Sequence, residues 1–275
     1  IARFKPTHAV VATPVESLAA VAGEVAGAGV RAILVEKPGA LTLFQGEALA
    51  NTARRAGAGI WVAYNRRFYA SVRAAREMIA ASGERISSVA FEFNEATGPD
   101  GPTGQSPETQ ARWLLANSAH VVDVALHPVG LPDPRRSTLL RHGGLSWHPA
   151  GSVFMGAGLT VKGVPFSYSA NWEAPGRWGF EWMTPSARYI FRPLETLQVM
   201  RQGSFAVSEV AIDDARDRAF KPGVFLQDRA FLAGDESAGL VPLDEALGLI
   251  RAVEAIAGYD EQTSMRTGRS ALSPR

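Results

Sequence analysis

The chain has 275 residues, of which 46% are hydrophobic and 20% are charged, with a formal net charge of +1 and no cysteine. This balance is typical of a globular protein, and the length is enough for a large core and more than one domain. A net charge near zero gives no electrostatic argument for nucleic acid or a membrane as partner. The lack of cysteine excludes a disulfide framework and a thiolate metal site. We find no signal peptide and no apolar run long enough to cross a bilayer, so we expect a cytoplasmic protein.

The first part of the chain reads as three strand–helix units. Each is a short apolar run followed by a segment with helical spacing. The strands are expected at 7–13, 31–36 and 59–64, and the helices at 15–27, 42–56 and 69–82. Thr42 and Ser71 stand where helix starts are expected, and Gly57 where a stop is expected. Such alternation predicts a parallel sheet covered by helices.

The pattern changes after residue 86. Residues 88–95 alternate like a strand with one buried face, residues 97–107 are a Gly/Pro-rich loop, and a helix is expected at about 111–127. Six short strands then follow one another: 139–147, 152–159, 164–172, 177–183, 187–191 and 196–200. Turn signals between them favour an antiparallel meander open on one side. Helices near 223–233 and 243–257 come last, before a polar tail after Tyr259.

We therefore predict an α/β protein in two parts. Residues 1–86 form part of a Rossmann-type parallel sheet, the C-terminal half of a dinucleotide-binding domain. Residues 87–275 form an α+β domain with a large, mostly antiparallel open sheet, for substrate binding and oligomerisation. Five aromatic residues of the expected meander exceed what one covered sheet face needs, which suggests pairing of subunits into a homodimer or homotetramer: Phe154, Trp172, Trp178, Trp182 and Tyr189.

The most informative segment is Val-Glu-Lys-Pro-Gly at 35–39. It ends an apolar run that reads as a buried parallel strand, and ligands of open α/β sheets bind outside the carboxyl ends of such strands. Lys37 would then be a cation placed in a ligand site. The alternative is that Glu36 and Lys37 only mark a solvated strand end.

A polar stripe runs along the helix expected at 111–127. Asn117, His120, Asp123 and His127 are spaced by three or four residues, so they share one face of an otherwise apolar helix. Chelation of a metal by such a stripe is an alternative. We do not favour it, because no cluster of Glu or Cys partners accompanies the stripe. His127 is better explained as a histidine of the core.

Five segments in the same order resemble the Gfo/Idh/MocA family of NAD(P)-dependent sugar and polyol oxidoreductases. They are Ala-Thr-Pro (12–14), Glu-Lys-Pro (36–38), Val-Ala-Tyr-Asn-Arg-Arg-Phe (62–68), the helix segment 112–123 and Phe-Lys-Pro-Gly-Val-Phe-Leu-Gln-Asp (220–228). The resemblance implies hydride transfer between a nicotinamide cofactor, NAD or NADP, and a carbon of a sugar, sugar derivative or polyol. It leaves open the choice of cofactor, the carbohydrate and the direction of reaction.

The resemblance also implies roles for individual residues. Lys37 and His120 match the reactive lysine and histidine, but Ala116 occupies the position of the family's aspartate, four residues before His120. Asn117 or Asp123 are the expected substitutes. We expect salt bridges for Arg66 and Arg67. The cofactor contacts are expected from Thr13, Pro14, Glu36, Lys37 and Asn65, and the substrate contacts from Arg112, Trp113, Asn117 and His120.

One part of the family pattern, the Gly-x-Gly-x-x-Gly turn that holds the cofactor pyrophosphate, does not occur in this chain. The first strand would also be an apolar edge without its usual neighbour. We therefore expect the sequence to be a fragment that begins within a Rossmann domain, and that binds a dinucleotide weakly by itself. The alternative is a non-catalytic module for sheet-mediated dimerisation or ligand binding that has lost its cofactor site.

Overall fold

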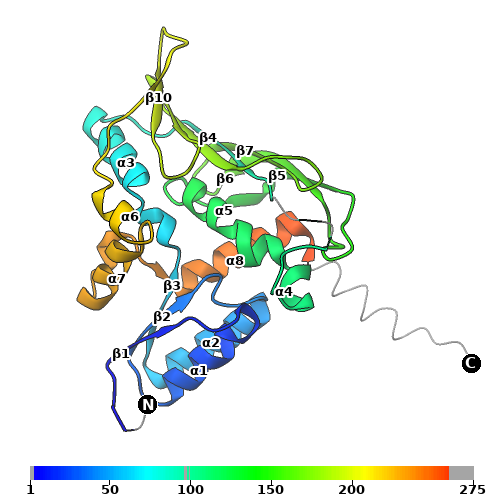
Figure 1. Cartoon of the computed structure of the whole chain (residues 1–275), viewed down its shortest axis with the longest axis vertical. Coiled ribbons are helices and arrows are strands. Elements are labelled where there is room, and N and C mark those ends of the chain that lie inside the picture. Colours follow the sequence, from blue (N-terminus) through cyan, green and yellow to red (C-terminus); the bar gives the residue numbers. More distant parts are fainter. Residues whose placement is uncertain (1–2, 96–97, 99, 260–275) are drawn as a thin grey trace, which may run out of the picture.

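The structure is a computed structural model that describes residues 3–95, 98 and 100–259. The tail predicted after Tyr259 and the start of the loop predicted from residue 97 lie outside the described residues. Two sheets make up the molecule, one of four strands and one of eight (Figure 1). The α/β class, with a parallel sheet followed by a large and mostly antiparallel one, is confirmed.

The first sheet has the parallel strands expected from the sequence. They are β1 (His8–Val11), β2 (Ala32–Glu36) and β3 (Gly59–Ala63), each followed by its helix: α1 (Leu18–Gly27), α2 (Leu43–Ala56) and α3 (Ala70–Ser82). Helix α2 begins as predicted, because the Thr42 hydroxyl accepts the Gln45 N–H, and it ends at Gly57 in the left-handed conformation. Helix α3 instead begins after Tyr69, because the Ser71 hydroxyl donates to the Leu194 carbonyl.

The last part of the chain returns to this first sheet. Strand β12 (Val241–Pro242) pairs antiparallel with β3, and Leu226 and Phe231 of helix α7 (Val224–Ala233) are buried together with Leu34 of β2. Helix α8 (Leu243–Ala257) runs between the two sheets in Figure 1. A division of the sequence at 86/87 therefore does not separate the two sheets completely.

The second sheet is not a simple meander. Strand β4 (Ser88–Phe93) lies in its middle, antiparallel to β8 (Trp178–Met183) and parallel to β7 (Pro165–Asn171). Its alternating apolar residues pair with aromatic strands on both sides, which places it centrally and splits the predicted run of six strands. The other strands are β5 (Pro132–His142), β6 (Val153–Thr160), β9 (Ala187–Phe191), β10 (Gln198–Arg201) and β11 (Val207–Glu209).

Four of the five aromatic residues that suggested an outer interface lie in the core, and the fifth, Trp178, is partly buried. Phe154, Trp172, Trp182 and Tyr189 are buried, and the Trp182 indole donates to the Ala125 carbonyl of the covering helix. They therefore face the helices rather than the solvent, and the argument for oligomerisation from these residues is wrong. No helix in the described part of the chain is long and apolar enough to cross a membrane.

Candidate active site

Lys37 lies where the carboxyl end of β2 opens towards the second sheet. Its Nζ donates a hydrogen bond of 2.7 Å to the carbonyl oxygen of Ala116, and the Lys37–Pro38 peptide is cis. Burial lowers the pKa of Lys37 to about 8, with a further contribution from the nearby Arg66 guanidinium, while Glu36 and Glu95 oppose the shift. Lys37 therefore does not mark a solvated strand end.

The helix expected at 111–127 is interrupted at the site. It consists of α4 (Pro107–Ala111), a π-helical turn η3 (Leu114–Ser118) and α5 (Ala119–Leu126). A π-turn inserts one extra residue into a helix, and such turns are frequent at functional sites. Within this wider turn, Ala116 receives the Lys37 hydrogen bond through its backbone, and the next two side chains, Asn117 and Ser118, both donate to Glu95.

His120 is buried at the start of α5, with 6% of its surface exposed. Its ring lies edge-on against Tyr64, with the centroids 5.7 Å apart, and its Nδ1 has no hydrogen-bond partner. Burial lowers the pKa of His120 well below its usual value, and the positive charges of Arg66, Lys37 and Lys221 lower it further. The imidazole is therefore neutral near pH 7.

Arg66 and Arg67 come from the short turn η2 (Asn65–Phe68) after β3 and have different environments. Arg67 forms the expected buried ion pair: its Nε and Nη2 both bond Asp123, and Nη2 also contacts Glu245 at 2.6 Å. Asp123 is therefore occupied and does not orient His120. The Arg66 guanidinium instead lies 4.8 Å from the centroid of Trp178, and its buried Nε has no hydrogen-bond partner. The salt bridge expected for Arg66 is absent from the described residues.

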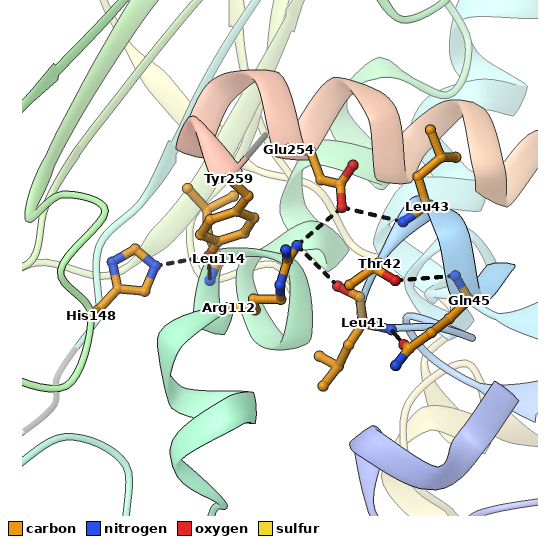
Figure 2. A network of polar contacts seen from close by, with 9 residues as sticks. All are labelled: Leu41, Thr42, Leu43, Gln45, Arg112, Leu114, His148, Glu254 and Tyr259. Atoms are coloured by element: carbon orange, nitrogen blue, oxygen red, sulfur yellow. Dashed lines mark hydrogen bonds and ion pairs between the residues drawn. The ribbon is translucent and has the colours of Figure 1, made fainter. Parts of the chain in front are cut away.

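Arg112 is placed differently from the substrate contact that we expected. Its Nη1 bonds Glu254 of α8 at 3.0 Å and the Leu41 carbonyl at 3.3 Å, and the guanidinium covers the Tyr259 ring (Figure 2). Glu254 also accepts the Leu43 N–H. Arg112 thus joins the segment before the π-turn to α8 and to the start of α2.

Tyr259 completes the same network from the end of α8. Its hydroxyl accepts the Leu114 N–H, the first backbone group of the π-turn, and bonds His148 Nε2 at 2.8 Å (Figure 2). His148 Nδ1 bonds the Gly151 carbonyl at 2.8 Å, so Nδ1 carries the proton and Nε2 accepts from the tyrosine. The π-turn that holds Ala116 is therefore fixed from outside the site.

The other expected site residues lie at strand ends on the same edge of the first sheet. Glu36 accepts the Lys37 N–H, and Thr13 accepts the hydroxyl of Ser17, beside Pro14. Asn65 donates to the Pro222 carbonyl and so anchors the segment 220–223 that the resemblance singled out.

Glu95 is the main residue that sequence reasoning missed. It is 8% exposed and follows β4, where the alternating strand pattern ended in an acid without an assigned role. Burial raises the pKa of Glu95, while the hydrogen bonds from Ser118 and Asn117 act in the opposite direction. In the sequence, Glu95 is recognisable as a charged residue at the end of a buried strand. No sequence feature indicated that its carboxylate would act on the charge of Lys37.

Several buried polar atoms around the site have no partner in the protein. They are Tyr64 Oη, Arg66 Nε, Trp113 Nε1 and His120 Nδ1. Buried polar groups are almost always hydrogen-bonded, so a cluster of exceptions indicates the place of a polar ligand. Within the described ranges, no group of three His, Cys, Asp or Glu side chains is placed to hold a metal ion.

No family model and no curated protein matches the chain. Solved structures match it along most of its length, and those named here are oxidoreductases by their descriptions. A candidate NADPH-dependent oxidoreductase from Desulfitobacterium hafniense aligns with a TM-score of 0.76 and 16% identity, over 95% of this chain and 80% of that one. The fold of the chain is therefore that of this class of oxidoreductases.

Two further structures carry named activities. UDP-N-acetylglucosamine 3-dehydrogenase from Acidithiobacillus ferrooxidans aligns with a TM-score of 0.70 and 14% identity, over 91% of this chain and 77% of that one. Levoglucosan dehydrogenase, solved with NADH and levoglucosan, aligns with a TM-score of 0.71 and 19% identity, over 92% of this chain and 77% of that one. The shared architecture is the two-domain fold of Gfo/Idh/MocA-type oxidoreductases.

Proposed function

We propose that the chain belongs to an NAD(P)-dependent oxidoreductase of the Gfo/Idh/MocA type that acts on an alcohol carbon of a sugar, sugar derivative or polyol. The observation that carries the proposal is the convergence of Lys37 and His120 at one edge of the first sheet. Lys37 Nζ is bonded to the carbonyl of Ala116, one helical turn before the buried His120. A cation and a neutral imidazole meet there among unpartnered polar atoms.

The two residues have complementary roles near neutral pH. With a pKa of about 8, Lys37 is mainly protonated and stabilises negative charge on a substrate oxygen. Neutral His120 accepts the hydroxyl proton when the alcohol is oxidised and returns it when the carbonyl is reduced. Lys37 and His120 are thus the proposed catalytic residues.

The nicotinamide cofactor fits the carboxyl edge of the first sheet. Thr13, Pro14, Glu36 and Asn65 occupy the ends of β1, β2 and β3, where ligands of open α/β sheets bind. A bound nicotinamide would supply the hydride chemistry. The unpartnered Nδ1 of His120, next to Lys37, offers hydrogen bonding at the reacting end. Two neighbours of similar fold were solved with NADH or described as NADPH-dependent, and the choice between the cofactors stays open for this chain.

A polyhydroxylated substrate fits the polar groups on the other side of Lys37. Trp113 offers an unpaired indole N–H, and Asn117 holds Glu95 at the same place. Aromatic faces and fixed polar groups of this kind bind the apolar and hydroxyl faces of a sugar ring. Levoglucosan and sorbose are the sugars bound by one neighbour of similar fold.

The test is a screen of sugars, sugar derivatives and polyols with both nicotinamide cofactors, in both directions, using the absorbance of the reduced cofactor. The wild type is compared with Lys37→Met, and Lys162→Met, an exposed lysine in the turn after β6, is the matched control. We expect turnover that Lys37→Met removes and Lys162→Met retains. Turnover untouched by Lys37→Met would contradict the assignment.

The second candidate is a non-catalytic dimerisation or ligand-binding module. One observation favours it, since Ala116 provides no carboxylate at the position of the family's aspartate. It predicts carbohydrate binding by calorimetry without turnover of any substrate, and equal binding to the wild type and His120→Ala.

We also propose that the outer face of the second sheet pairs two copies of the chain. Leu140 of β5 and Met155 of β6 lie opposite each other in the sheet and are 51% and 50% exposed. Adjacent exposed apolar residues on a sheet face favour an interface. A concentration-independent monomer in sedimentation would contradict this, and Met155→Asp should dissociate the dimer.

A further inference from the structure

Glu95 is a buried acid held only by neutral donors. Asn117 Nδ2 bonds both of its carboxylate oxygens at 3.0 Å, and Ser118 Oγ bonds Oε1 at 2.7 Å. Among the described residues it has no ion pair within salt-bridge distance. A buried carboxylate without a direct counter-charge costs free energy, so its retention requires a compensating role.

The two residues before Glu95 are held by hydrogen bonds from the second sheet. The Trp172 indole donates to the Phe93 carbonyl at 3.0 Å, and the Asn94 side chain accepts the Asn171 N–H at 2.6 Å. Both partners belong to the β7 side of the second sheet. A side chain supported in this way by rigid elements is held precisely, as a functional carboxylate requires.

The π-turn η3 holds both Glu95 and Lys37. Successive residues of a regular α-helix point about 100° apart, so two neighbours do not normally bond the same group. In the wider turn η3, Asn117 and Ser118 both reach Glu95. The residue before them, Ala116, uses its carbonyl to hold Lys37 Nζ. One turn of chain thus fixes the carboxylate and the ammonium group together.

The position of Glu95 matters because Lys37 is buried beside two other cations. Burial, Arg66 and Lys221 disfavour its ammonium form, whereas Glu36 and Glu95 favour it. Glu36 is at the strand end and bonds the Lys37 backbone N–H, while Glu95 approaches from the opposite sheet. The charged or titratable groups that face Lys37 are Glu36, Arg66, Glu95, His120 and Lys221.

We propose that Glu95 supplies, from the second sheet, the carboxylate that the helix lacks at Ala116, and that it is a positioning residue which keeps the Lys37 ammonium group protonated beside the substrate oxygen. This inference rests on the proposed function of the same site. It implies that the carboxylate of this protein comes from a strand instead of from the catalytic helix, with Asn117 and Ser118 as its holders.

The protonation of Lys37 can be measured without turnover. The chain has only four lysines, at positions 5, 37, 162 and 221. Lysine labelled with ¹³C at the ε-carbon therefore gives four resonances, and Lys37→Arg identifies that of Lys37. We expect the wild-type Lys37 signal to titrate near pH 8. Opposite charges within a few ångströms shift a pKa by about 1–3 units, so Glu95→Gln should lower the midpoint by about one unit.

Two variants make the result specific. Glu92→Gln is the matched control, because Glu92 lies three residues before Glu95, on β4, but pairs with Arg192 and does not act on Lys37. It should leave the midpoint unchanged. Glu95→Asp keeps the charge with a shorter side chain and should restore most of the shift, even if it weakens the bonds to Asn117 and Ser118. An unchanged or raised midpoint in folded Glu95→Gln would overturn the proposal.

The activity profile gives a second readout. If a protonated Lys37 is required, kcat/KM falls as the pH rises through its pKa, and Glu95→Gln should move this fall to lower pH by the same amount. Failure of the proposed function would appear as absence of turnover in the wild type, whereas failure of the present inference would appear as an unshifted lysine titration. The two failures are therefore distinguishable.

Discussion

Arg66 and Arg67 are neighbours in the chain but belong to two regions with opposite properties. Around Arg67, the charged groups are paired: Asp123 receives two of its nitrogens and Glu245 a further bond. Around Arg66, buried polar atoms lack partners, among them its own Nε and His120 Nδ1. Asp123 and His120 are three residues apart on the same helix. The difference shows that a single polar stripe can be divided into a half that stabilises the fold and a half that is kept open for a ligand.

The largest expected effect concerns the paired region. Arg67→Met leaves Asp123 as an uncompensated charge, with 2% of its side chain exposed. Removing one partner of a buried pair costs about 3–5 kcal/mol, and the free energy of unfolding in urea should fall by that amount. Arg188→Met is the control, because its pair with Glu181 is partly exposed and worth about 1 kcal/mol or less. Equal losses of unfolding free energy in Arg67→Met and Arg188→Met would contradict the stabilising role that we assign to the buried pair of Arg67 and Asp123.

In the region around Arg66 and His120, where buried polar atoms lack partners, a substitution should lower kcat rather than stability. His120→Ala should lower kcat by about 10²–10⁴-fold, the usual contribution of a general acid–base group, without unfolding the protein. His127→Ala, on the same stripe at the end of α5, should act mainly through stability and cost far less activity. Circular dichroism and steady-state kinetics of both variants check this. Near-wild-type turnover of His120→Ala on every accepted substrate would show that the catalytic assignment is wrong.

The third prediction concerns the pH dependence of stability that arises from His148, the residue that bonds Tyr259. Burial lowers the pKa of His148 from its ordinary value of 6.5 to about 4 in the folded protein. Below pH 6.5 the unfolded chain binds a proton that the folded chain does not, so this group reduces stability as the pH falls towards 4. The loss is about 2 kcal/mol between pH 7 and pH 5. Urea unfolding at both pH values should show a smaller pH dependence for His148→Gln than for the wild type.

The smallest expected effect concerns the contribution of the Thr42 cap to the stability of helix α2. Thr42→Ala removes the hydroxyl that caps α2 and should cost about 1 kcal/mol of unfolding free energy, with little change in kcat. Thr52→Ala, within the same helix, has no capping role and should change stability by less than about 0.5 kcal/mol. A larger loss for Thr52→Ala would show that α2 is stabilised in another way.

The sequence was sufficient where local chemistry decides the structure. The parallel strands, helices α2 and α8 and the cap at Thr42 follow from apolar spacing and from end signals, and they lie where the pattern predicted. Strand β12 could not be found, because a pair of residues at 241–242 carries no periodicity of its own. The placement of β4 between β7 and β8 is a choice among several possible pairings, which depends on packing across the whole sheet.

The site was predictable in part. Lys37 and His120 were named from a strand end, a polar stripe and the resemblance to a family. Arg112 was named a substrate contact from the resemblance, and its ion pair with Glu254 was not foreseen because Glu254 comes from a helix distant in sequence. The π-turn and Glu95 were missed for a related reason, since an extra residue in a helix leaves no signature in a pattern of apolar residues.

The pairing of β12 with β3 has a consequence for folding. Val241 lies opposite Val62, so the first sheet is completed by residues that are synthesised long after its parallel strands. Contacts between residues this distant in sequence close a long loop and slow folding. On the ribosome, the edge of β3 and the apolar residues later covered by α7 remain exposed until most of the chain has emerged. The nascent first sheet therefore exposes an apolar edge while the second sheet is still being synthesised.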